Sequence, residues 1–327
     1  MAETVVVTGA TSGVGRAVAC AFARDGCRVA LLARGQEGLE GTVRDVEQAG
    51  GRALPLPTDV ADHDQVEAAA VATEEAFGEI DVWINSAMTT VFAFFDDAEP
   101  EEFRRATEVT YLGSVWGLKA ALTRMLPRDR GSIVQVGSAL GKQGIPLQSA
   151  YCGAKHGIQG VFESLRCELA HRGSNVSLSI VQLPGLNTPQ FDHCRSKLPN
   201  EPMPVPPIYQ PEVAADAIRF ASRHRRREIY VGASTVYTIW GRNLAPSLAE
   251  RYLARTAVGA QQRDQPLGED VRPGNLFDPV PGDPGARGDF DADAHGRSLV
   301  LELGKRRRAI GVAAAALGAV LLTRARP

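Results

Sequence analysis

The sequence predicts an α/β fold, a doubly wound parallel sheet that forms a single domain with a C-terminal extension. Short apolar runs alternate with longer amphipathic runs over residues 1–258, which is typical of successive strand–helix–strand units. Polar or glycine-containing segments follow most of the apolar runs, where such sheets bind ligands. We therefore expect a globular domain at 1–258, a flexible linker rich in Pro, Gly and Asp at 259–304, and a C-terminal segment at 305–327.

The apolar runs place the strands, and the amphipathic runs between them place the helices. The helix that starts at Pro100 has two glutamates in its first turn, which favours a helix N-terminus. Strands are expected at 4–7, 27–32, 52–56, 80–84, 133–136, 176–182 and 229–231, and helices at 16–24, 36–49, 62–77, 100–125, 149–171, 212–222 and 235–258.

The turn after the first strand is rich in glycine, with Gly9, Gly13 and Gly15 in TGATSGVG. A strand, a glycine turn and a helix in this order let a pyrophosphate approach the backbone and face the helix N-terminus. An ordinary tight turn is the alternative.

Two charged residues follow the next two strands. Arg34 stands where a carboxylate would bind the ribose of NAD, and an arginine there suits the 2′-phosphate of NADP instead. Asp59 could hydrogen-bond an adenine edge or cap a helix. The sequence therefore favours NADP over NAD, with a solvated surface charge as the alternative for Arg34.

The central stretch is Ser138 to Lys155. Tyr151 lies 13 positions after Ser138, and Lys155 follows four residues later, on the same helix face. A phenol has a pKa of about 10, and a nearby ammonium would bring it toward the range of a general acid/base. Ser138 would donate a hydrogen bond to a substrate oxygen. A plain surface Tyr/Lys pair is the alternative.

Together these motifs resemble the short-chain dehydrogenase/reductase family over residues 3–235, including TGxxxGxG and the Pro184-Gly185…Thr188 turn. The resemblance implies a Rossmann-like fold and an NADP(H)-dependent oxidoreductase that interconverts a carbonyl and a secondary alcohol. Ser138, Tyr151, Lys155 and Thr110 would be catalytic. The implied cofactor-binding residues are Gly9, Thr11, Ser12, Gly13, Val14, Gly15, Arg34, Asp59, Val60, Asn85, Tyr151, Lys155, Pro184, Gly185 and Thr188.

Two residues depart from the family pattern. Met88 replaces a glycine after Asn85-Ser86-Ala87 and could narrow the site. Thr110 stands where the family has an Asn that holds a relay water, so relay efficiency is in doubt. A non-redox member of the family, such as a dehydratase or epimerase, and a non-enzymatic nucleotide-binding sensor or scaffold are the alternative functions.

The remaining features concern substrate and location. The Pro-rich stretch from Leu186 to Pro211 is predicted to be a lid over a small, hydrophobic substrate. A net charge of −2 gives no sign of nucleic acid, and the five cysteines lack metal-site spacing. We expect a cytoplasmic homo-oligomer without a signal peptide or metal. The uncharged run from Ala309 to Leu322, between basic residues, predicts membrane contact through 305–327, with a capping or oligomer helix and a disordered tail as alternatives.

Overall fold

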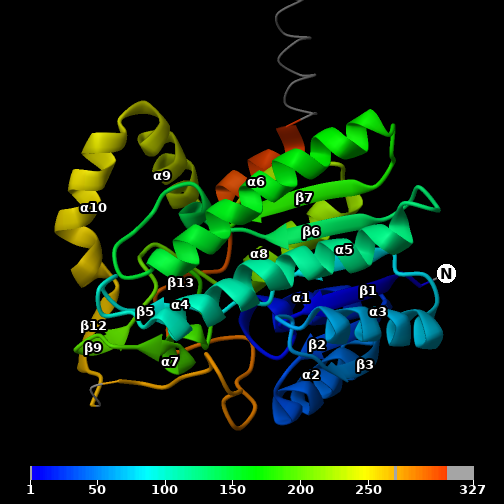
Figure 1. Cartoon of the computed structure of the whole chain (residues 1–327), viewed down its shortest axis with the longest axis horizontal. Coiled ribbons are helices and arrows are strands. Elements are labelled where there is room, and N and C mark those ends of the chain that lie inside the picture. Colours follow the sequence, from blue (N-terminus) through cyan, green and yellow to red (C-terminus); the bar gives the residue numbers. More distant parts are fainter. Residues whose placement is uncertain (1, 269–270, 308–327) are drawn as a thin grey trace, which may run out of the picture.

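A computed structural model describes residues 2–268 and 271–307. Its centre is a seven-stranded parallel sheet in the order β11-β7-β6-β4-β1-β2-β3 (Figure 1), which confirms the predicted doubly wound α/β fold. The strands of this sheet are β1 (Thr4–Thr8), β2 (Arg28–Ala33), β3 (Arg52–Pro57), β4 (Val82–Asn85), β6 (Ser132–Val136), β7 (Ser177–Gln182) and β11 (Glu228–Tyr230).

The sheet is covered by helices on both faces because its strands are apolar on both sides. In β1, Val5 and Val7 face one helical layer and Val6 faces the other, since successive side chains of a strand point to opposite faces. One layer contains α1 (Gly13–Ala23), α2 (Gln36–Gln48) and α8 (Pro211–Arg223), and the other contains α3 (His63–Phe77), α5 (Gly113–Met125) and α6 (Ser149–His171).

The strand order reverses at β1, which pairs with β2 on one side and β4 on the other. At this point the chain leaves adjacent strands toward opposite faces, and a crevice opens at their carboxyl ends. The Thr8 hydroxyl accepts hydrogen bonds from the N–H groups of Ser86 and Ala87, at 3.0 and 3.1 Å. The end of β1 thereby fixes the loop after β4 and forms the floor of the crevice.

The helix predicted at 100–125 is interrupted. It consists of α4 (Pro100–Thr107), a π-helical turn (Glu108–Leu112) and α5. Within the turn, the Thr110 hydroxyl donates to the carbonyl of Thr89 at 2.9 Å and accepts from its N–H at 3.0 Å. This long-range contact accompanies a π-turn that local helix propensity does not reveal.

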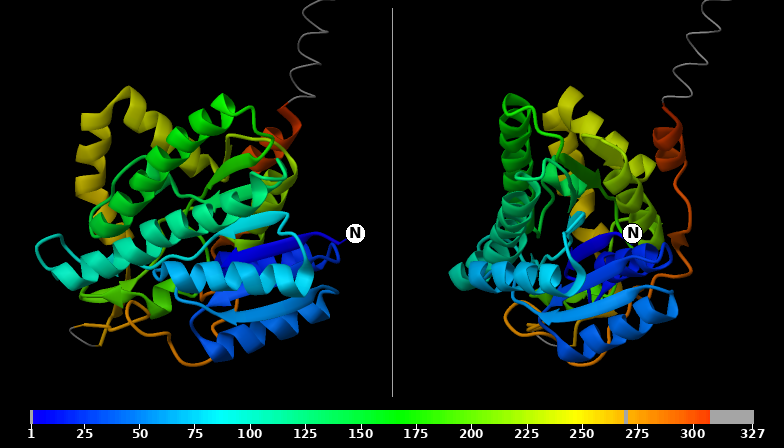
Figure 2. Two further views of the ribbon diagram at one scale, coloured as in Figure 1. Left: turned by 45° about the vertical axis from the view of Figure 1, so that its right-hand side comes forward. Right: turned by 90° about the vertical axis from the view of Figure 1, so that its right-hand side faces the viewer.

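The helix predicted at 235–258 is also two helices, α9 (Ala233–Leu244) and α10 (Pro246–Ala260). Pro246 lacks an N–H and restricts the residue before it, and Ala245 accordingly has φ −148° and ψ 67°. The two yellow helices form a hairpin at the carboxyl end of the sheet (Figures 1 and 2).

The lid predicted from Leu186 to Pro211 contains a short helix and three short strands that pair with distant segments. These pairings fix the lid against the body of the domain. The elements are α7 (Gln190–His193), β8 (Arg195–Ser196) with β5 (Val91–Phe92), β9 (Asn200–Pro202) with β12 (Gln262–Pro266), and β10 (Ile208–Tyr209) with β13 (Ala294–His295).

The structure differs from the predicted flexible linker at 259–304. Leu276 and Phe290 are buried in separate clusters, and Asn187 donates to the Asp291 carboxylate at 2.9 Å. Isolated apolar residues among prolines and glycines thus hold this segment on the domain, which composition alone does not reveal. Residues 299–307 are helical.

Most of the predicted membrane segment, residues 308–327, lies outside the described residues. Within 2–268 and 271–307, no helix combines the length and the apolar character that a membrane crossing requires.

Glu102 is 1% exposed and pairs with Arg195 and, at 2.9 Å, Lys197, so it joins α4 to the lid. Despite burial, its hydrogen bonds with the Glu99 N–H, Lys197 and Arg195 lower the pKa of Glu102. Glu102→Gln should lower the free energy of unfolding by about 2 kcal/mol at pH 7. Because this stabilisation needs the carboxylate, the loss should shrink as the pH falls through its ordinary pKa of about 4.3 and below.

Urea denaturation at pH 7 and pH 4 tests this prediction. The exposed neighbour Glu101→Gln is the control. Equal effects of the two substitutions would contradict the assignment.

Candidate active site

A cavity of about 550 Å³ lies at the carboxyl ends of the sheet strands. It reaches from the glycine-rich turn to α9 and α10, and it brings together residues that are far apart in the sequence. The predicted site residues that line it are Gly9, Thr11, Ser12, Gly13, Val14, Gly15, Arg34, Asp59, Val60, Ser138, Tyr151, Lys155, Pro184, Gly185 and Thr188. Asn85 and Thr110 are not among its lining residues.

The glycine-rich turn needs its glycines for backbone packing. Gly9 has φ +66°, and a Cβ there would lie 2.7 Å from the Cα of Ala87. A Cβ at Gly15 would lie 2.1 Å from the carbonyl oxygen of Gly9. The turn therefore packs closely on itself and on the loop after β4, and it lines the cavity at the N-terminus of α1.

Arg34 and Asp59 form the far end of the cavity. Arg34 donates to the carbonyls of Asn275 and Phe277, both at 2.5 Å, while Asp59 pairs with Arg105. Burial, and then the nearby Arg105, lowers the pKa of Arg34. Asp59 is not the cap of α3, because Asp62 fills that position.

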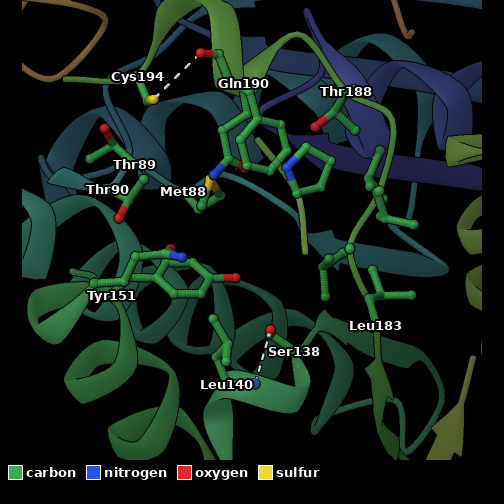
Figure 3. A pocket seen from close by; sticks show the side chains of 18 of the residues that line it. Met88, Thr89, Thr90, Ser138, Leu140, Tyr151, Leu183, Thr188, Gln190 and Cys194 are labelled. Atoms are coloured by element: carbon green, nitrogen blue, oxygen red, sulfur yellow. Dashed lines mark hydrogen bonds between the residues drawn. The ribbon is translucent and has the colours of Figure 1, made fainter. Parts of the chain in front are cut away.

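Ser138, Tyr151 and Lys155 come together at the other end. Ser138 follows β6 and accepts a hydrogen bond from the Leu140 N–H at 3.1 Å, while Tyr151 and Lys155 lie one turn apart on α6. Figure 3 shows the Tyr151 and Ser138 hydroxyls near each other at the cavity. The Lys155 ammonium donates to the Val136 carbonyl at 2.8 Å and lies 5.5 Å from the centre of the Tyr151 ring.

The electrostatics of this cluster differ from the expectation that Lys155 lowers the pKa of Tyr151. Burial raises the pKa of Tyr151, and the hydrogen bond with Ser138 acts in the opposite direction. Burial also lowers the pKa of Lys155 to about 8. The ammonium lies over the ring and is bound to a carbonyl, so in this geometry desolvation outweighs its attraction to the phenolate.

Two predicted site residues, Asn85 and Thr110, do not line the cavity and instead hydrogen-bond neighbouring elements together. Asn85 accepts a hydrogen bond from the Trp83 indole at 2.8 Å and donates to the Ser114 carbonyl at 3.2 Å, so it joins β4 to α5. Both hydrogen bonds of the Thr110 hydroxyl go to the backbone of Thr89. Thr110 therefore holds the loop beside Met88, which lines the cavity, and the predicted water relay gains no support from its position.

Several lining residues escaped the sequence argument because they come from the loop before α6, the lid, the hairpin and residues 275–284. The repeated Pro and Gly in PVPGDPG (279–285) are a visible signal in the last of these parts, but this composition is equally typical of a flexible linker. The additional residues include Gln148, Gln190, His193, Tyr237, Tyr252, Asn275, Pro279 and Pro284. Burial lowers the pKa of His193 to about 4, so this imidazole is neutral near pH 7.

A sequence model described as short chain dehydrogenase matches residues 3–198. That span includes the glycine turn, Ser138, Tyr151 and Lys155, and exceeds half of the chain. The chain belongs to the short-chain dehydrogenase/reductase family. The expectation of an enzyme of this family, an oxidoreductase, is thereby confirmed.

Other members of the short-chain dehydrogenase/reductase family share most of this architecture. An uncharacterized oxidoreductase, YxnA, of Bacillus subtilis is 30% identical over 81% of this chain and 75% of its own. 3-Dehydrosphinganine reductase of Danio rerio is 32% identical over 57% of each chain. A crystal structure of actinorhodin polyketide ketoreductase with NADPH superimposes with a TM-score of 0.61 and 26% identity, covering 70% of this chain and 95% of that one.

The buried Lys155 predicts a pH dependence of stability. Its pKa is about 8 in the folded protein and about 10.4 in the unfolded chain, so the unfolded state binds more protons between these values and stability rises with pH. Relative to Lys155→Met, the wild type should gain about 2 kcal/mol of unfolding free energy from pH 7 to 9.5.

Urea denaturation of both proteins at the two pH values measures this gain. Lys119→Met, at an exposed position of α5, should show no such change relative to wild type. A constant difference between wild type and Lys155→Met would show that the ammonium is not desolvated.

Proposed function

We propose that this enzyme is an NADP(H)-dependent reductase that converts a carbonyl on an apolar substrate to a secondary alcohol. The observation that carries the proposal is one cavity with the Tyr151–Ser138 hydroxyl pair and the buried Lys155 at one end and Arg34 at the other. The cofactor supplies a hydride when bound, and the residues of this chain supply the proton and the position of the substrate oxygen.

The cofactor preference is supported by the charges at the end of β2. No carboxylate follows this strand, where NAD would need one for its ribose hydroxyls, and Arg34 stands there instead. Burial lowers the pKa of Arg34, and the nearby Arg105 acts in the same direction, so a 2′-phosphate of NADP would stabilise the charged guanidinium. The glycine-rich turn, which lines the cavity at the N-terminus of α1, would hold the pyrophosphate.

The proton chemistry favours reduction. A phenol with a raised pKa stays protonated at neutral pH and can donate its proton, but it is a poor base for the reverse reaction. Ser138, which lies near Tyr151, would donate to the carbonyl oxygen as charge develops on it. Two of the similar proteins are named reductases, which agrees with this direction.

The substrate end of the cavity is largely apolar. Its walls come from the loop after β6, the lid and the hairpin of α9 and α10, and Tyr237 and Tyr252 extend from the cavity to the surface with 60% and 66% exposure. The apolar wall residues are Leu140, Ile145, Phe191, Met203, Val205, Leu253, Ala257 and Ala260. Such a surface suits a hydrophobic carbonyl compound.

Membrane contact through 305–327, a cytoplasmic location and assembly as a homo-oligomer stay predictions of the sequence. They do not enter the proposed chemistry.

Tyr151→Phe tests the proton donor. Removing one hydroxyl should lower turnover by at least about 1,000-fold while NADPH still binds, since the phenol acts on the substrate oxygen. Turnover with a panel of hydrophobic ketones and NADPH fluorescence titration measure the two effects. Tyr111→Phe, outside the cavity lining, is the matched control. Retained turnover in Tyr151→Phe would refute the assignment.

Arg34→Ala tests the cofactor preference. Without the guanidinium, NADPH should bind about 10- to 100-fold more weakly, as expected for a lost charge-assisted contact, and NADH should lose clearly less affinity. Parallel titrations with both nucleotides provide the measurement, and Arg172→Ala, exposed at the C-terminal end of α6, is the control. An equal loss for both nucleotides would contradict a 2′-phosphate contact.

A further inference from the structure

Residues 275–285, here called the strap, cross the nucleotide end of the cavity. They lie beyond residues 3–198, which the family sequence model covers. In Figure 1 the strap belongs to the orange chain that passes below α7 and reaches α2. Pro279, Val280, Gly282 and Pro284 line the same cavity as the glycine-rich turn. The cavity therefore has the turn on one side and the strap on the other.

The strap is bound at its first end through Arg34 and Leu276. The carbonyls of Asn275 and Phe277 accept both terminal nitrogens of Arg34, and the side chain of Leu276 is fully buried. The N–H of Asn275 donates to the carbonyl of His193 at 2.8 Å. This end is therefore fixed to β2 and to the lid.

The other end is bound through Asp283 and its neighbours. Asp283 pairs with Arg16, which is nearly buried on α1, and lies 3.7 Å from Arg44. The Gly282 N–H donates to the Glu37 carboxylate, and the carbonyl of Gly285 accepts from the Gly13 N–H at 3.1 Å. The strap is thus attached to α1 and α2, which belong to the same helical layer.

These attachments leave the strap compatible with a bound anion. Its negative charge nearest the glycine turn, Asp283, is neutralised by Arg16, and Arg16 is also held by Asp45 at 2.8 Å. The strap offers Arg34 two neutral carbonyl oxygens as hydrogen-bond acceptors, and its one carboxylate near the guanidinium, Asp278, is exposed to solvent. A 2′-phosphate would be the stronger partner for the guanidinium charge.

We propose that the strap is part of the dinucleotide site: it covers the adenosine half of bound NADP, and the nucleotide enters and leaves only when the strap detaches. The proposal rests on the NADP-binding function proposed above. It assigns retention of the cofactor to the strap, which lies outside the residues that the family sequence model covers.

Asp283→Asn weakens one attachment without removing a cavity wall. NADPH should dissociate about tenfold faster, because a charge-assisted contact that holds the strap is lost. Glu37→Ala, which removes the acceptor of the Gly282 N–H from the exposed side of α2, should act in the same direction. Asp293→Asn, exposed and outside the strap, is the matched control.

Stopped-flow fluorescence of NADPH release measures the rates, and hydrogen exchange of the full-length protein measures the strap directly. Saturating NADPH should slow amide exchange in residues 275–285 of the wild type, and less so in Asp283→Asn. Thermal denaturation confirms that each variant is folded.

The outcomes are separable. If the wild type does not bind NADPH, the proposed function fails. If the wild type binds NADPH, two results would refute the proposal that the strap covers the nucleotide. One is a release rate from both folded variants equal to that from Asp293→Asn, and the other is faster amide exchange in the strap with NADPH bound. The proposed function would stand in both cases.

Discussion

The hydrogen bond between the Lys155 ammonium and the Val136 carbonyl connects the two halves of the catalytic end. It ties α6 to the last residue of β6, two residues before Ser138. Because Tyr151 lies one turn earlier on the same helix, this contact also determines where the phenol meets the Ser138 hydroxyl. A buried ammonium is costly, and here a single described hydrogen bond to the backbone compensates for part of that cost. The fold accepts this cost at a position where Lys155 lines the cavity beside Tyr151.

Desolvation is the common physical cause of the unusual groups around the cavity. It raises the pKa of Tyr151 and lowers the pKa values of Lys155, His193 and Arg34. Each group is thereby pushed toward its neutral form. For Tyr151 this keeps the phenol protonated at neutral pH, and for Arg34 the nearby Arg105 acts in the same direction as burial. Both effects agree with the proposed reduction of a carbonyl with a phosphorylated dinucleotide.

The C-terminal third of the chain supplies cavity walls that residues 3–198, the span of the family model, do not supply. The hairpin of α9 and α10 forms the apolar end of the cavity, and the strap forms the wall at the nucleotide end. Both depend on a few long-range contacts, such as Leu276 in its cluster and Asp283 with Arg16. Residues 3–198 thus hold Ser138, Tyr151 and Lys155, and the later segments complete the walls of the cavity.

The sequence by itself determined the sheet, the glycine turn and the Ser138, Tyr151 and Lys155 cluster, because period-two apolar runs and i,i+4 spacing are local properties. It also placed Arg34 at the correct strand end. Only the tertiary structure decided that Asn85 and Thr110 bond to neighbouring backbone and side chains, that Pro246 separates two helices, and that residues from 275–285 line the cavity. These outcomes depend on hydrogen bonds and packing between segments distant in the chain, and on desolvation, which no local pattern encodes.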